Sequence, residues 1–226
     1  MRTNLMAGNW KMFKTPAETR AFFEAFNPLV AGSANDIALC PSYVCLAAAV
    51  EATAGSNVAI GSQNIFWEKE GAFTGEVSGP MLKAVGCAYA IAGHSERRQF
   101  FGETDATVLK RTQAALEYGL TPIVCVGELL EERESGATDA VLITQFDGGI
   151  AGLTVAQFAK IVIAYEPVWA IGTGKVATPE IAAAAHRTIR GRVAEKFGRC
   201  RSCGSHPLRR QREPRQCENS DGGRRD

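Results

Sequence analysis

The sequence has no long hydrophobic run and no large excess of charge of either sign, and its first residues do not follow the pattern of a signal peptide. No apolar stretch approaches the roughly 20 residues that cross a membrane. Met1–Leu5 leads directly into an apolar strand pattern instead of the hydrophobic region of a signal peptide. These absences argue against a membrane protein or a secreted one, so we expect a cytoplasmic protein with no membrane partner.

The composition is otherwise that of an ordinary soluble enzyme. With 226 residues, 46% hydrophobic and 22% charged, the chain is long enough for one sizeable core. Four of the 7 cysteines, Cys40, Cys45, Cys87 and Cys125, lie in or beside apolar segments. Buried free thiols behave there as small hydrophobes, so we expect no disulfide among them.

Residues 199–226 differ in composition from the rest of the chain. They hold 8 of the 25 Lys and Arg but 4 of the 24 Asp and Glu, which gives them a net charge of +4 and the remainder −3. Leu208 is their only large aliphatic residue. Such a segment cannot bury enough apolar surface to fold, so we expect one folded domain over residues 1–198 and a disordered tail over 199–226.

Short apolar strands alternate with helical patterns over residues 1–198, which predicts strand-helix units and a parallel sheet. The expected strands are Asn4–Asn9, Asp36–Cys40, Val58–Gln63, Tyr89–Ala92, Thr121–Val126 and Ile161–Tyr165. The expected helices are Pro16–Asn27, Tyr43–Glu51, Gly79–Val85, Thr104–Tyr118, a less regular Leu129–Phe146, and Pro179–Phe197. In the last helix, Thr178 fits an N-cap and His186 is expected at the surface.

One carboxylate stands where a buried strand meets a loop suited to movement. Ile161–Ala164 is a continuous apolar run, as in a parallel strand covered on both faces. Glu166 follows this run, and Pro167 ends the strand. The loop beyond them carries bulky apolar residues and ends in glycines. This pattern indicates a lid that can expel water from a small substrate. An ordinary connection with a solvated Glu166 fits the stretch alone equally well.

Three separate stretches resemble the triosephosphate isomerase family. Tyr165–Lys175 reads Y-E-P-V-W-A-I-G-T-G-K, like the family's catalytic glutamate and flexible loop. Ala7–Met12 is similar to the end of the family's first strand, and Ala92–Arg98 to the end of its fourth. The resemblance covers Met1 to about Gly198. It implies a (β/α)8 barrel, of which six units are recognisable, with an irregular tail in place of strands 7 and 8.

The implied reaction interconverts dihydroxyacetone phosphate and D-glyceraldehyde 3-phosphate, in glycolysis and gluconeogenesis, without a cofactor or metal. By resemblance, Glu166 is the base and a neutral His94 is the electrophile that holds the enediolate oxygen. Lys11 supplies a positive charge and Asn9 a hydrogen-bond donor for the substrate. From the residues alone, His94 fits a core histidine with satisfied hydrogen bonds, and Lys11 fits a solvated surface charge.

Further roles are implied by the same resemblance. Glu96 matches the carboxylate that fixes the lysine, and Cys125 a buried structural cysteine beside the site. The loop Asn64–Gly79 resembles one that inserts into a partner subunit, with Thr74 reaching toward the partner's lysine, which implies a homodimer. The backbone N–H of Gly172 matches one of the family's phosphate-binding groups.

The other phosphate-binding groups of the family, a serine loop after strand 7 and paired glycines after strand 8, are absent from this sequence. Remote binding energy of this kind contributes to the chemical step as well as to affinity. The alternative function is therefore an inactive, truncated remnant of the isomerase.

The tail allows two interpretations. Cys200, Cys203, His206 and Cys217 fit a zinc knuckle, and the arginines fit nucleic-acid binding. A frame slip explains more: with suitable synonymous codons, Leu208–Asn219 read one nucleotide later spells Y-G-G-S-V-N-P-A-N-A-K, like the family's seventh strand end and serine loop. We therefore expect a frameshift near Gly198, a tail without evolved function, and no nucleic-acid partner.

Overall fold

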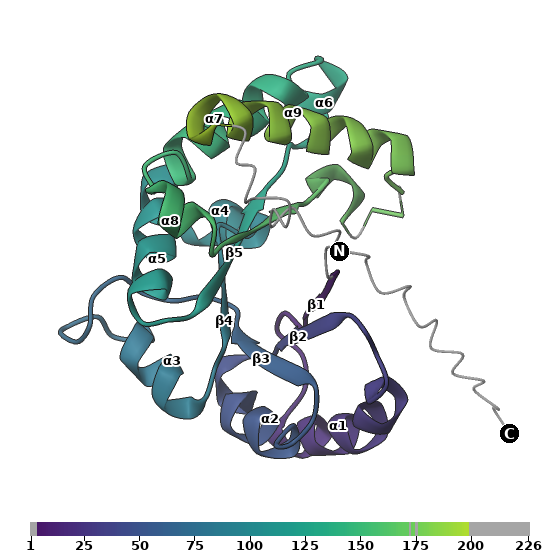
Figure 1. Cartoon of the computed structure of the whole chain (residues 1–226), viewed down its shortest axis with the longest axis vertical. Helices are drawn as coiled ribbons and strands as arrows, with labels where there is room; N and C mark the ends of the chain where they lie inside the picture. Colours follow the sequence, from purple (N-terminus) through teal and green to yellow (C-terminus); the bar gives the residue numbers. More distant parts are fainter. Residues whose placement is uncertain (1–3, 172, 175, 199–226) are drawn as a thin grey trace, which may run out of the picture.

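The computed structural model describes residues 4–171, 173–174 and 176–198. Within them, six strands form one sheet in chain order, and every neighbouring pair is parallel. The strands are β1 Leu5–Asn9, β2 Asp36–Cys40, β3 Val58–Ser62, β4 Tyr89–Ala92, β5 Thr121–Val126 and β6 Val162–Tyr165. Figure 1 shows the sheet as a curved arc with the helices on its outer side.

At least one helix follows each strand, with two after β4 and three after β5. The helices are α1 Pro16–Val30, α2 Leu46–Ala52, α3 Gly79–Val85, α4 Ser95–Phe101, α5 Asp105–Glu117, α6 Leu130–Glu134, α7 Thr138–Gly149, α8 Val155–Phe158 and α9 Pro179–Phe197, with short 3-10 turns at Tyr43–Cys45 and Val168–Ala170. No helix in the described part of the chain is both long and apolar enough to span a membrane.

The sheet is covered on both faces. On its concave side, alternate strand residues form one buried cluster: Leu5, Ala38, Cys40, Ile91, Ile123, Cys125, Val162 and Ala164. On its convex side, the intervening residues pack against the helices in two larger clusters. This double burial explains why the strands are continuous apolar runs, and it confirms the prediction made from Ile161–Ala164.

The six predicted strand-helix units are confirmed, and they correspond to six units of a (β/α)8 barrel. Among the described residues the sheet is open, since β1 and β6 stand at opposite ends of the strand order. The predicted tail, residues 199–226, lies outside the described residues.

Two short helices were not predicted, and one predicted helix is divided. Helix α4 contains no buried residue, so its sequence has no apolar periodicity to reveal it. Helix α8 is only four residues long. The stretch predicted as Leu129–Phe146 forms α6 and α7 because Gly136, with a φ of 76°, takes a left-handed conformation between them.

Helix α9 has the predicted bounds. The Thr178 hydroxyl accepts a hydrogen bond from the backbone N–H of Ile181, as expected of an N-cap. The prediction of a surface position for His186 is wrong, because its half-buried ring packs against Tyr165 at a centroid distance of 6.1 Å.

Candidate active site

Polar side chains gather where the strands end. Asn9 closes β1, His94 follows β4 and Glu166 directly follows β6. The carboxyl ends of parallel strands in such a barrel lie on one rim, so residues far apart in the sequence meet there.

Glu166 and His94 face each other across this rim. His94 Nε2 lies 3.3 Å from Glu166 Oε1, and the two side chains are 8% and 11% exposed. The backbone N–H of Ser95 donates to the other carboxylate oxygen, Oε2, at 3.1 Å. Burial of this kind makes the carboxylate depend on a few fixed donors instead of on water.

The hydrogen bond at Nδ1 of His94 indicates which ring nitrogen carries the proton. His94 is the N-cap of α4, and its Nδ1 accepts a hydrogen bond from the backbone N–H of Glu96 at 3.2 Å. An acceptor nitrogen carries no proton, so the ring is neutral with its proton on Nε2, the atom that faces Glu166. The imidazole is therefore oriented as a hydrogen-bond donor into the site.

Lys11 is held in an unusual backbone conformation. Its φ is 54°, in the left-handed region that non-glycine residues rarely adopt. Its N–H donates to Asn9 Oδ1 at 2.9 Å, and its carbonyl accepts from Gln63 Nε2 at 2.8 Å. Its ammonium pairs with Glu96 Oε1 at 2.7 Å. These contacts place one positive charge beside the His94 turn.

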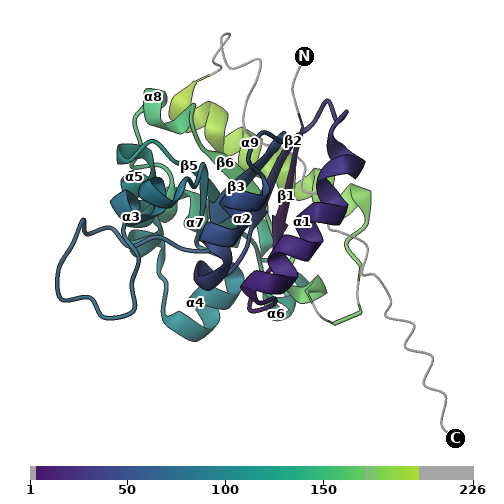
Figure 2. The same ribbon diagram turned by 90° about the horizontal axis from the view of Figure 1, so that it is seen from below.

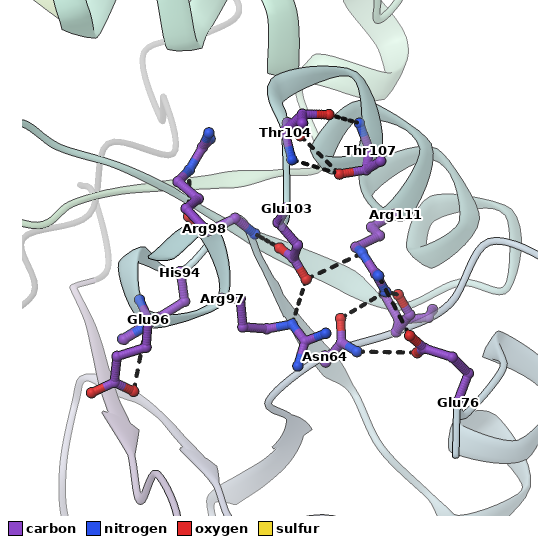
Figure 3. A network of polar contacts seen from close by, with 12 residues as sticks. Asn64, Glu76, His94, Glu96, Arg97, Arg98, Glu103, Thr104, Thr107 and Arg111 are labelled. Carbon is purple, nitrogen blue, oxygen red and sulfur yellow. Dashed lines mark hydrogen bonds and ion pairs between the residues drawn. The ribbon is translucent and has the colours of Figure 1, made fainter. Parts of the chain in front are cut away.

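The turn that carries His94 is fixed on both sides (Figure 3). Gly93 has a φ of 73°; its N–H donates to Glu103 Oε2 at 3.1 Å and its carbonyl accepts from Arg98 Nε at 2.9 Å. Arg98 also pairs with Asp105 at 2.6 Å. Because both peptide groups at Gly93 are bonded to side chains, the direction of the His94 ring is set by the surrounding structure.

The same network extends away from the site. The Glu103 side chain is 1% exposed and pairs with both Arg97 and Arg111. Arg111 Nη1 donates to Asn64 Oδ1 at 2.9 Å, and Arg111 Nη2 lies 3.6 Å from Glu76 Oε1 (Figure 3). Buried arginines need such partners, because an unpaired charge in the core is strongly destabilising.

Asn64 and Glu76 lie at the two ends of the connection between β3 and α3. Figure 2 shows this connection as a loop that projects from the body of the molecule. Thr74 is exposed near its tip, and the neighbouring Phe73 is 42% exposed. The structure therefore does not bring Thr74 to the other candidate residues that it describes.

The sequence interpretation missed Glu128, which follows β5 by two residues. Its carboxylate is fully buried, and Oε1 accepts from Tyr165 Oη and Trp169 Nε1, both at 2.9 Å. Arg133 also approaches Oε1, at 3.3 Å. Burial and the Glu128 carboxylate raise the pKa of the Tyr165 hydroxyl above its usual range. A signal was available, since Glu128 follows the carboxyl end of a parallel strand, as His94 and Glu166 do.

Cys125 lies beneath the site. Burial, followed by the nearby Glu166 carboxylate, raises the pKa of its thiol well above the usual range. The four cysteines of the described residues are free, and burial raises the pKa of Cys40 to about 12. Cys125 is therefore an unreactive thiol, in keeping with the structural role expected of it.

Five candidate residues thus meet at one rim: Asn9, Lys11, His94, Glu96 and Glu166. Gly172 lies outside the described residues. Within the part of the chain that the structure describes, no cluster of His, Cys, Asp or Glu could hold a metal ion. Fold and site together define a (β/α)-barrel protein with a buried carboxylate facing a neutral imidazole, and an ammonium group beside them.

The comparisons with known proteins identify the family. Residues 4–203 match the family model of triosephosphate isomerase. Triosephosphate isomerase of Solibacter usitatus is 70% identical over 200 residues, which span 88% of this chain and 80% of the relative. The enzymes of Citrifermentans bemidjiense and Moorella thermoacetica are 52% and 51% identical over the same shares of each chain. The chain belongs to the triosephosphate isomerase family.

Proposed function

We propose that this chain interconverts dihydroxyacetone phosphate and D-glyceraldehyde 3-phosphate. The observation that carries the proposal is the pair formed by Glu166 and His94, an acceptor and a donor 3.3 Å apart on the rim of the barrel. A reaction that moves a proton between adjacent carbons needs both groups, one to take the proton and one to hold the oxygen that becomes negative.

Glu166 is the base. It takes a proton from the substrate carbon beside the carbonyl, and the electron pair of that C–H bond forms the carbon–carbon double bond of an enediolate. The carbonyl oxygen becomes the enediolate oxygen and is held by the Nε2–H of His94. The hydroxyl proton on this first carbon passes to the former carbonyl oxygen. The protonated Glu166 then gives its proton to the former carbonyl carbon, and the oxygen that lost its proton becomes the new carbonyl. No cofactor takes part, because the reaction has no net change in oxidation.

Lys11 and Asn9 are the proposed substrate-binding groups. The ammonium of Lys11 offsets the negative charge of the phosphate and the enediolate, and Glu96 holds this ammonium in place through the 2.7 Å ion pair. Asn9 acts partly through Lys11, whose N–H it binds. The backbone N–H of Gly172 is proposed as a phosphate ligand, on the resemblance of its loop to the family's.

A homodimer is also part of the proposal. Its interface is the projecting loop from Asn64 to Gly79, with Thr74 directed at the partner's lysine. Exposed apolar side chains support this: Phe73 on the loop is 42% exposed, and Met12 and Phe13, beside Lys11, are 93% and 69% exposed. Apolar groups of this size at a subunit surface favour burial against a second copy. Sedimentation equilibrium of the purified chain measures the association.

Residues 199–226 are proposed to be an out-of-frame tail without its own function, in a cytoplasmic protein. The change in composition supports the first point, and the free cysteines support the second. The test compares the purified chain with a frame-restored version in a coupled isomerase assay. Activity only in the restored version favours an inactive remnant. Comparable activity in both would mean that the tail takes the place of strands 7 and 8, which contradicts a tail without function.

The catalytic assignment is tested by Glu166→Gln in the same assay. The amide has the shape of the carboxylate but is not a base, so kcat should fall by about 10³-fold. Glu24→Gln, on the exposed face of α1, is the matched control and should leave kcat unchanged. Unchanged activity of the Glu166→Gln variant contradicts the assignment.

A further inference from the structure

The backbone of Glu166 rests directly on the end of β5. A methyl group placed on Gly127 would lie 1.7 Å from the Glu166 carbonyl oxygen, so only glycine fits there. The N–H of Glu166 donates to the carbonyl of Val126 at 2.8 Å. The position of the Glu166 backbone therefore depends on where Val126 and Gly127 lie.

Gly127 lies beyond the last register pair of the two strands, Val126 with Tyr165. Its peptide groups are bonded by a side chain from α7 instead. Gln145 Oε1 accepts the N–H of Gly127 at 2.8 Å, and Gln145 Nε2 donates to the carbonyl of Gly127 at 3.0 Å. The side-chain amide thus does for Gly127 what the peptide group of a neighbouring strand does within the sheet.

We propose that Gln145 is a positioning residue for the base Glu166. The inference rests on the proposed function of Glu166, and it adds a residue that does not contact the reacting atoms. The path is short: the Gln145 amide fixes the Gly127 peptide groups, and Gly127 supports the backbone of Glu166. Two bonds from one rigid amide fix the orientation of the Gly127 backbone as well as its distance from α7.

The two hydrogen bonds of Gln145 also affect the loop that follows Glu166. Glu128 is the next residue after Gly127, and its buried carboxylate accepts the indole N–H of Trp169 at 2.9 Å. A shift of Gly127 moves the Glu128 carboxylate, and Trp169 with it. Gln145 therefore positions the base and the first turn of its loop together.

Gln145→Leu is the decisive variant, because leucine is of similar size and makes neither hydrogen bond. We expect kcat to fall by about tenfold or more, since a displacement well below 1 Å is enough for such a loss. KM should change by less than kcat does, because the binding groups Asn9 and Lys11 lie at the end of another strand and only Gly172 belongs to the loop that follows Glu166. Amide hydrogen exchange should be about threefold faster or more in peptides that cover residues 126–129 and 163–170.

Gln145→Glu keeps the acceptor for the Gly127 N–H but loses the donor, so its kcat should lie between those of the wild type and the leucine variant. The matched control is Gln157→Leu. Gln157 also accepts a backbone N–H, that of Thr154 at 2.9 Å, but it caps α8 away from the rim. The control should lose some stability and keep both the wild-type kcat and the wild-type exchange near Glu166.

The proposal is contradicted if Gln145→Leu keeps kcat within twofold and exchange at 163–170 unchanged. It is equally contradicted if Gln157→Leu loses as much kcat as Gln145→Leu while the two variants have the same melting temperature. If the wild type shows no turnover, the proposed function fails, and the exchange difference between the two leucine variants still decides whether Gln145 holds the Glu166 backbone. If Gln145→Leu does not fold, Gln145→Glu undergoes the same measurements.

Discussion

The turn that carries His94 and the strand end that carries Glu166 are held by different means. The Gly93 peptide groups are bonded to charged side chains close in sequence, those of Arg98 and Glu103. Glu166 is held by groups from distant parts of the chain: the N–H of Ser95, the carbonyl of Val126 and the packing against Gly127. His94 thus lies beside a network of buried ion pairs, whereas Glu166 packs against backbone and amide groups.

The difference is one of energetics. In the His94 region, removing one charge leaves its partners unpaired in the core, so each such substitution should be strongly destabilising. In the Glu166 region, most contacts are neutral hydrogen bonds and close packing. Their loss costs less stability but displaces Glu166. We therefore expect the loss of a polar partner to affect stability most in the first region and the rate most in the second.

The largest effect is expected at Gly127, in the Glu166 region. Gly127→Ala places a methyl group against the Glu166 carbonyl, so the strand end and the base must separate. We expect a loss of more than about 3 kcal/mol in the free energy of unfolding and about 100-fold in kcat. Gly191→Ala, in α9 with open space around it, is the control and should be neutral or stabilising. Urea unfolding and the isomerase assay measure both quantities.

Two buried carboxylates, Glu103 and Glu128, test whether the His94 and Glu166 regions are held by different means. Glu103→Gln removes the charge shared by Arg97 and Arg111, and should cost about 3 kcal/mol in unfolding free energy. Glu128→Gln should cost about 1 kcal/mol, because an amide oxygen still accepts from Tyr165 and Trp169, and Arg133, which loses its charged partner, is partly exposed to solvent. Equal losses of stability in the two variants mean that the two regions are not held differently.

A smaller effect is expected at Trp169. Trp169→Phe removes the indole N–H that bonds Glu128 and should lower the unfolding free energy by about 1 to 2 kcal/mol. The exchange of backbone amides at 168–171 should rise, whereas that at 93–98 should not. A rise in both segments would show that the two regions are coupled more closely than we describe.

The smallest effect is expected at the Asp105–Arg98 ion pair, at the edge of the polar network around Gly93. The Asp105 and Arg98 side chains are 25% and 19% exposed, so solvent screens their attraction. Asp105→Asn should cost less than about 1 kcal/mol by thermal unfolding, because Arg98 still donates to Gly93. A loss as large as that of Glu103→Gln contradicts the distinction between the buried and the peripheral ion pair.

The sequence predicted most of the fold, since strands such as Asp36–Cys40 and helix Pro179–Phe197 have strong local patterns. The resemblance to the family also gave the residues that meet at the rim. They lie together because the carboxyl ends of parallel strands share one side of the sheet. The sequence could not show that Gly127 touches Glu166 or that Gln145 holds Gly127. These contacts arise from the register of β5 with β6 and from the docking of α7, which no local pattern encodes.

The account is tested most directly by proton exchange at carbon. Dihydroxyacetone phosphate is incubated with the protein in D2O, and proton NMR follows the loss of one carbon-bound hydrogen. We predict that the wild-type chain exchanges this hydrogen and that Glu166→Gln is slower by about 10³-fold. Exchange at the wild-type rate in Glu166→Gln, or none in the folded wild type, would contradict the claim that Glu166 is the base of an isomerase site.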